Sequence, residues 1–142
     1  MKKTYILCSQ LLLATAFSFA LSGKDIPMGL IDCDSTVYPA ALKIATGDVY
    51  LHGDAERNIL QNIDAAQTCY TAAIRETASK ADQGVANFKL GEIFYYYGKN
   101  LTENATLAKE TVREYLMEAT RLGNIDAEIL LNNILFGPAV KK

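Results

Sequence analysis

The chain contains one pattern that occurs nearly twice, and this repetition limits the folds open to it. Residues 46–53 (TGDVYLHG) are echoed by residues 90–98 (LGEIFYYYG). After a polar loop, each copy is followed by an alanine-containing segment, residues 66–73 and residues 112–119. The first two segments lie 44 positions apart and the other two lie 46 apart. A period of this size is typical of stacked helical repeats, which usually form binding surfaces rather than catalytic pockets.

The spacing of apolar residues predicts five helices and no strand. We expect them to cover residues 37–52, 62–79, 82–97, 106–122 and 126–135. Gly53, Gly98 and Gly123 are expected to end the first, third and fourth of these helices. Short turns and two polar loops would join the helices, so the fold class that we predict is all-α, a fragment of an α-solenoid.

Residues 1–22 have the organisation of a secretory signal peptide. Lys2 and Lys3 supply a positive start, and an uncharged apolar run precedes the small residues Ala20 and Ser22. We therefore predict a periplasmic or secreted protein, with no stable membrane insertion after cleavage. The alternative is an uncleaved membrane anchor, for which the apolar run is slightly short. The short, lysine-rich signal is typical of bacteria.

The rest of the chain divides into three parts. Residues 23–36 are expected to form an extended leader, residues 37–135 the helical repeat domain and residues 136–142 a C-terminal tail. Without residues 1–22 the formal charge changes from −2 to −4, because two lysines and no acid are removed. A weakly acidic domain without a basic cluster argues against nucleic acid and anionic membranes as partners.

Two cysteines, Cys33 and Cys69, remain after the signal peptide. In an oxidising compartment this number suits one disulfide, which is our prediction. The alternative is that Cys69 is a small buried apolar residue and Cys33 a free thiol. Asp32 and Asp34 flank Cys33, but two carboxylates without a histidine nearby are too few ligands for a metal. We expect a turn there that caps the next helix, and we expect no metal or cofactor.

These positions resemble the repeats of the SEL-one-like family, relatives of the tetratricopeptide repeats. The first helix of that repeat is matched by Gly47, Tyr50 and Gly53 and again by Ala86, Leu90, Gly91, Phe94 and Gly98. The second helix is matched by Ala66, Cys69, Tyr70 and Ala73 and again by Val112, Tyr115, Leu116, Ala119 and Gly123. The resemblance covers about residues 37–135. It implies a short right-handed α-solenoid of about two and a half helix-turn-helix repeats, and it implies protein binding without catalytic residues.

Two groups of residues are candidates for contact with a partner. Positions of the first helices that face away from the core are Asp48, His52, Lys89, Glu92 and Tyr96. Four consecutive aromatic residues point in different directions on a helix, so at least one of Tyr95, Tyr96 and Tyr97 should be exposed. The alternatives are an ordinary solvated face and packing of these rings against a loop. His52 has no nucleophile or second ligand spaced to act with it.

The function that we predict is that of an exported, non-enzymatic protein-binding repeat protein. It would act as an adaptor, a regulator or an immunity or inhibitor-type partner of another protein. One rival is a structural subunit that self-assembles through its open end, with Leu130, Leu135 or Phe136 exposed there. Another is a cell-wall-related hydrolase or ligand binder, which the absence of a catalytic motif disfavours.

Overall fold

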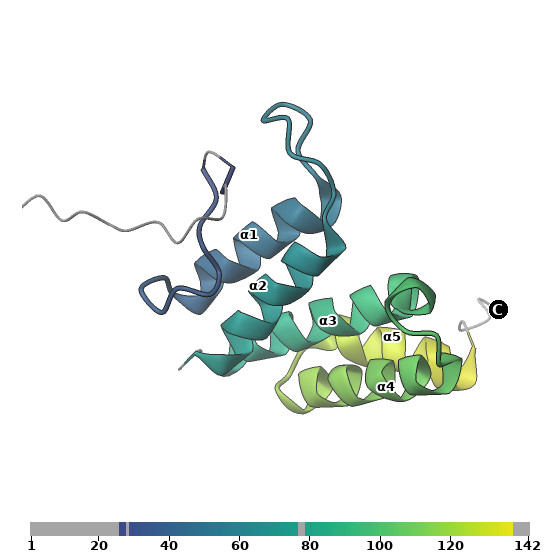
Figure 1. The fold of residues 1–142 in the computed structure, drawn as a ribbon. Helices are drawn as coiled ribbons and strands as arrows, with labels where there is room; N and C mark the ends of the chain where they lie inside the picture. The colour runs from purple at the N-terminus through teal and green to yellow at the C-terminus, as the bar shows by residue number, and fades with distance from the viewer. Residues whose placement is uncertain (1–25, 28, 77–78, 138–142) are drawn as a thin grey trace, which may run out of the picture.

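The computed structural model describes residues 26–27, 29–76 and 79–137, and these form five α-helices (Figure 1). The helices are α1 (Ala40–His52), α2 (Ile63–Arg75), α3 (Lys80–Leu101), α4 (Ala105–Arg121) and α5 (Ile125–Phe136). In this part of the chain there is no strand, only a single bridge between Asp54 and Ile59. The all-α prediction is confirmed. The expected signal peptide and residues 138–142 lie outside the described residues.

Helices that follow one another in the chain lie side by side (Figure 1). α1 packs on α2, α3 packs on α4, and α4 packs on α5, while α2 contacts α3 and joins the first pair to the rest. One apolar cluster spans α1, α2 and α3 around Tyr70 and Leu90. A second cluster spans α3, α4 and α5 around Leu116 and Ala127. None of the described helices combines the length and the apolar character that a membrane crossing requires.

Three helix boundaries differ from the sequence prediction by three residues or more. The expectation that the second helix reaches residue 79 is wrong, because Glu76 is extended (φ −71°, ψ 162°) and α2 ends at Arg75. α1 begins at Ala40, after the expected residue 37, because Pro39 is extended (φ −68°, ψ 156°) and stands before the helix. α3 runs past Gly98 to Leu101, so the prediction that Gly98 ends this helix is wrong. A Cβ atom at Gly98 would lie 3.2 Å from the Cβ of Ala108, so this glycine allows α3 and α4 to approach.

Left-handed glycines follow α1, α4 and α5, the first two as predicted. Gly53 has φ 73° directly after α1, and Gly123 has φ 89° near the end of α4. Residues with a Cβ rarely adopt this conformation, which is why glycine is common at helix ends. The two expected turns are therefore confirmed at these positions.

The two halves of the sequence repeat make the same close contact. A Cβ atom added to Gly47 in α1 would lie 2.7 Å from the ring of Tyr70 in α2. A Cβ atom added to Gly91 in α3 would lie 2.7 Å from Leu116 in α4. In each pair a helix with a glycine lies directly against a large buried side chain of the next helix. The glycines are therefore required by packing and not by backbone conformation.

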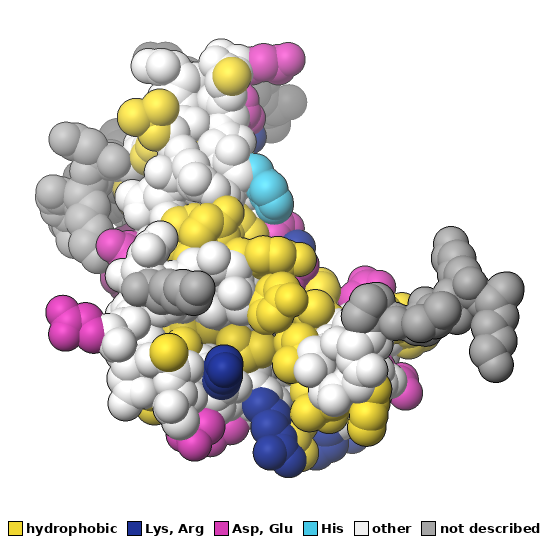
Figure 2. Space-filling model, turned by 90° about the vertical axis from the view of Figure 1, so that its right-hand side faces the viewer, with side chains coloured by type: hydrophobic (Ala, Val, Ile, Leu, Met, Phe, Trp, Pro, Cys, Tyr) yellow, Lys and Arg dark blue, Asp and Glu magenta, His cyan; other side chains and the backbone are white. Residues whose placement is uncertain are grey.

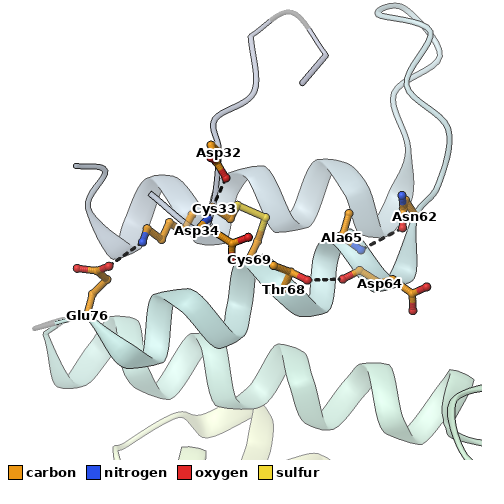
Figure 3. Close-up of a disulfide and its surroundings, with 10 residues drawn as sticks. Asp32, Cys33, Asp34, Asn62, Asp64, Ala65, Thr68, Cys69 and Glu76 are labelled. Carbon is orange, nitrogen blue, oxygen red and sulfur yellow. Dashed lines mark hydrogen bonds and ion pairs between the residues drawn. A yellow bond between two sulfur atoms is a disulfide. The ribbon is translucent and has the colours of Figure 1, made fainter. Parts of the chain in front are cut away.

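The leader is attached to the domain by the disulfide between Cys33 and Cys69, which confirms the predicted bridge. Both cysteines are buried, and the bond joins the leader to the middle of α2 (Figure 3). Asp32 Oδ1 accepts a hydrogen bond from the backbone N–H of Asp34 (3.1 Å), so a turn forms here as expected. The expectation that this turn caps α1 is wrong, because α1 has no side-chain cap and five residues separate Asp34 from Ala40.

A buried ion pair joins the beginning of α1 to the end of α2. Lys43 is almost fully buried, and its Nζ lies 2.7 Å from Oε1 of Glu76. A buried cation without a partner costs several kcal/mol, so removing Glu76, which is itself partly exposed, would leave the charge of Lys43 unpaired in the core. The sequence shows no sign of this pair, because its members lie 33 positions apart and neither belongs to a motif.

We expect Gly47→Ala and Gly91→Ala each to lower the free energy of unfolding by about 1–2 kcal/mol. Alanine favours a helix by about 1 kcal/mol over glycine, but the clash at 2.7 Å outweighs this gain. Urea denaturation measures the change. Gly84→Ala is the control, because its Cβ would have 3.3 Å to its nearest neighbour and the same helix gain. Equal stability of all three variants would contradict the packing role.

Loss of the disulfide should destabilise the fold. Its cysteines are 36 positions apart, and closing a loop of that length is worth roughly 4 kcal/mol in the chain-entropy model. We expect a reducing agent to shift the urea midpoint of the wild type downward. The double variant Cys33→Ala/Cys69→Ala should show the lower midpoint with or without reductant. A midpoint that does not respond in the wild type would show that the bridge adds no stability.

Candidate functional site

The structure brings together the charged residues that were predicted to face a partner. Asp48 lies on α1, and Lys89 and Glu92 lie on α3, which contacts α1. The Nζ of Lys89 lies 3.8 Å from Oδ1 of Asp48 and 3.3 Å from Oε2 of Glu92. One ammonium group thus bridges two carboxylates, and the cluster has a formal charge of −1. These three charged residues form one surface with His52, Tyr95 and Tyr96, and we call this surface the α1–α3 face.

Tyr70 supports the charged cluster from the interior of the protein. The hydroxyl of this fully buried residue donates a hydrogen bond to Oδ1 of Asp48 (2.7 Å). Burial raises the pKa of Tyr70 far above its ordinary value, and the hydrogen bond to Asp48 and the charges of Asp48 and Glu92 add to this effect. Tyr70 therefore keeps its proton and fixes the position of Asp48. The sequence identified Tyr70 as a repeat position but not as part of the site, because the hydroxyl partner lies on another helix.

His52 ends α1 at the edge of the same face. Its Nδ1 lies 2.9 Å from the backbone oxygen of Asp48. Since a carbonyl oxygen can only accept, Nδ1 carries the proton in this contact, and Nε2 is left as the acceptor of a neutral ring. His52 lines a small cavity of about 290 Å³ together with Glu92 and Tyr96. The predicted residues His52, Glu92 and Tyr96 thus surround one hollow.

The aromatic run on α3 separates into exposed and supporting rings. Tyr96 is 64% exposed, and Tyr95, about half exposed, contacts it edge to face at 4.9 Å between ring centroids. Phe94 points the other way and stacks on Tyr115 of α4. The expectation that at least one tyrosine is exposed is confirmed. Tyr95 and Tyr96 are the rings that a partner can reach.

Tyr97 supports the cavity wall. Its ring packs against the core cluster of α1, α2 and α3, and its hydroxyl accepts a hydrogen bond from Nε2 of Gln61 (3.2 Å). The same Nε2 donates to the backbone oxygen of Leu51 (2.8 Å). Gln61 therefore links the end of α1, the loop after it and α3. This link keeps the histidine and the tyrosines of the α1–α3 face in place.

An apolar groove lies beside the α1–α3 face. It has a volume of about 450 Å³ and is lined by α3, the first half of α4 and the second half of α5. Figure 2 shows this side of the molecule, with hydrophobic side chains gathered between the histidine and a group of Lys and Arg side chains. Lys109 and Arg113 of α4 line the groove and are exposed. The sequence did not predict this groove, which depends on how three helices meet.

A larger cavity of about 720 Å³ lies under the leader. Residues 31–34, the loop before α2 and the first half of α2 line it. Burial raises the pKa of Tyr50 in its wall, and the negative charge of Asp32 adds to the effect. No group of three or more His, Cys, Asp or Glu side chains suited to a metal ion occurs in residues 26–27, 29–76 and 79–137. The disulfide between Cys33 and Cys69 holds this segment against α2.

Comparison with protein-family models, with curated proteins and with solved structures gives no match to this chain. The resemblance to SEL-one-like repeats therefore stays a prediction from the residues. Function has to be argued from the geometry of the α1–α3 face and the surfaces beside it.

The raised pKa of Tyr70 predicts loss of stability at alkaline pH. Above about pH 10 the unfolded chain releases the phenolic proton while the folded state keeps it, so the free energy of unfolding falls with pH by about 1.4 kcal/mol per pH unit. Tyr70→Phe should make this slope shallower in urea denaturation between about pH 9 and pH 11. Tyr96→Phe removes an exposed hydroxyl and serves as the control. An identical slope in the wild type and Tyr70→Phe would contradict the prediction.

Proposed function

We propose that the protein is an exported, non-enzymatic binding protein that holds another protein at its α1–α3 face. The observation that carries this proposal is the cavity between His52, Glu92 and Tyr96, with a second exposed tyrosine in contact with its rim. Exposed tyrosines beside a small hollow are typical hot spots of protein interfaces, because they bury a large apolar area and keep a polar tip.

The rigidity of the face favours binding. Asp48 is fixed by Tyr70, and Lys89 is within ion-pair distance of both Asp48 and Glu92. The hydrogen bond from Gln61 to Tyr97 connects the loop after α1 to α3, the helix that carries the exposed tyrosines. Side chains that are already ordered lose little conformational entropy when a partner binds. A face of this kind is suited to recognition, and its groups do not form a nucleophile–base pair.

The charges indicate what the partner presents. Two carboxylates and one ammonium group leave a net negative charge next to two tyrosine rings. An arginine or lysine from the partner would find Glu92 as an ion-pair partner. It would also find the face of an exposed tyrosine for a cation–π contact. The proposed partner therefore offers a basic side chain with an apolar neighbour.

The helical repeat and the location of the protein outside the cytoplasm are part of the same proposal. The equivalent glycine contacts in α1–α2 and α3–α4 support two units of one helical repeat, with α5 beginning a third. We infer a short right-handed solenoid of the SEL-one-like type. The disulfide is typical of an oxidising compartment, and together with the signal-like residues 1–22 it supports a periplasmic or secreted protein. The role of adaptor, regulator or immunity protein fits this design.

The proposal predicts that a partner is lost when the face is altered. Wild-type protein and the variants Tyr96→Ala and Glu92→Ala are used as baits on the envelope and extracellular fractions of the source cell, with mild crosslinking. We expect the wild type to retain one specific protein, and each variant to reduce its recovery at least about tenfold. Met117→Ala, which truncates a half-exposed apolar side chain on α4, is the matched control.

The partner found in this way is then titrated against each purified variant. A dissociation constant that rises for Tyr96→Ala and Glu92→Ala but not for Met117→Ala supports the α1–α3 face. Equal affinity of all variants would place the contact elsewhere. No retained protein under crosslinking would count against the adaptor role itself.

A further inference from the structure

The last helix exposes large apolar side chains on the side that faces away from the core. Ala127 is the fully buried residue of α5, and Leu130 and Leu131 pack beside it against the core. On the opposite side of the helix, Ile125 is 70% exposed and Phe136 is 83% exposed. A helix that is apolar all round is normally covered on all sides, and a helix that closes a repeat array normally has a polar outer face. α5 has neither arrangement.

The outer residues of α5 have the spacing of a coiled-coil seam. Ile125, Ile129, Asn132 and Phe136 follow one another at intervals of four, three and four residues, and all four are exposed. This interval keeps side chains on one stripe that can pack against a second helix, knobs into holes.

We propose that this stripe is the contact with a second copy of the chain, in which the two α5 helices pack antiparallel about a two-fold axis. In this arrangement Ile125 lies opposite Phe136 of the partner subunit, and Ile129 lies opposite Asn132 of the partner subunit. The pairing is self-complementary, as a two-fold interface must be. The contact closes after two copies and does not lead to a filament.

Charge selects the antiparallel direction. Asp126 and Glu128 lie in the first turn of α5, and the second half of the helix has no charged residue. A parallel pair would bring these acids close to their own copies, which costs free energy. An antiparallel pair moves them to the uncharged half of the partner helix instead.

The basic rim of the apolar groove completes the match. Lys109 and Arg113 are exposed and line the groove together with Leu135. Neither forms an ion pair with any residue that the structure describes. Glu128 and Leu135 are seven residues apart, so they share one flank of α5. In the antiparallel pair, Glu128 therefore approaches the groove of the partner subunit and the two cations on its rim, and the symmetry repeats this contact.

The size of the contact indicates a weak dimer. The stripe from Ile125 to Phe136 has 12 residues, a length of about 18 Å. A single helix pair of this length buries less than the roughly 1,200 Å² of a standard interface, so we expect a dissociation constant in about the micromolar range. The inference is independent of the proposed function, because the α5 seam has no residue in the α1–α3 face; only Tyr95 lies both in that face and in the wall of the groove.

Sedimentation velocity on the purified protein, processed as the cell leaves it, tests the proposal between about 1 μM and 1 mM. We expect the mass to rise from one copy to two and to stop there. Ile129→Glu should weaken the dimer about a hundredfold, because it places a charge in an apolar seam. Leu60→Glu, at a residue that is 82% exposed in the loop before α2, is the matched control. A constant monomer mass, or growth beyond two copies, would overturn the proposal.

Crosslinking tests the direction of the helices. The double variant Ile125→Cys/Phe136→Cys should form a covalent dimer under mild oxidation, whereas Ile125→Cys alone should not. Wild type controls for exchange with the Cys33–Cys69 bridge. Glu128→Lys should weaken the dimer about tenfold, and adding Arg113→Glu should restore it. Crosslinking of the single variant would show a parallel pair, and a dimer insensitive to Glu128→Lys would refute the proposed charge contact.

Discussion

The close approach of paired helices at glycine is the constraint on which the rest of the structure depends. Gly47 gives Tyr70 room to lie flat against α1, and Gly91 does the same for Leu116 against α3. Because the ring of Tyr70 lies against Gly47, its hydroxyl can donate a hydrogen bond to Asp48. Asp48 in turn lies within reach of Lys89 on α3. One steric requirement in the core therefore determines the charged cluster on the surface.

Two bonds between residues far apart in the sequence attach segments that lie at the edge of the apolar core. The disulfide joins the leader to α2, and the Lys43–Glu76 ion pair joins the beginning of α1 to the end of α2. The described domain is small, and its two apolar clusters are joined mainly through α3. A disulfide adds stability where little apolar area is available to bury, and the ion pair gives the buried Lys43 the partner that it needs. Neither bond involves a residue of the α1–α3 face or of α5.

Much of the fold could be predicted because its signals are local. The period of the repeat, the apolar spacing and the glycines after α1 and α4 indicated five helices in their correct order. Gly98 was misread as a stop, since a glycine in a helix looks the same whether backbone conformation or a neighbouring helix requires it. The helix positions that face away from the core, among them Asp48, His52 and Glu92, were enough to select much of the site. Tyr70 was missed as part of it because its partner lies on a different helix.

The sequence by itself determined the helical class, the cysteine pair and the residues of one candidate face, because periodicity and composition follow from the chain alone. Only the tertiary structure decided which side chains meet. It placed Lys89 between two carboxylates, separated Tyr97 from the exposed tyrosines Tyr95 and Tyr96, and opened the groove bordered by Lys109 and Arg113. It also showed that α5 keeps an apolar outer stripe. Contacts between helices depend on the distance and angle between the helix axes, and the spacing of residues along the sequence does not give these quantities.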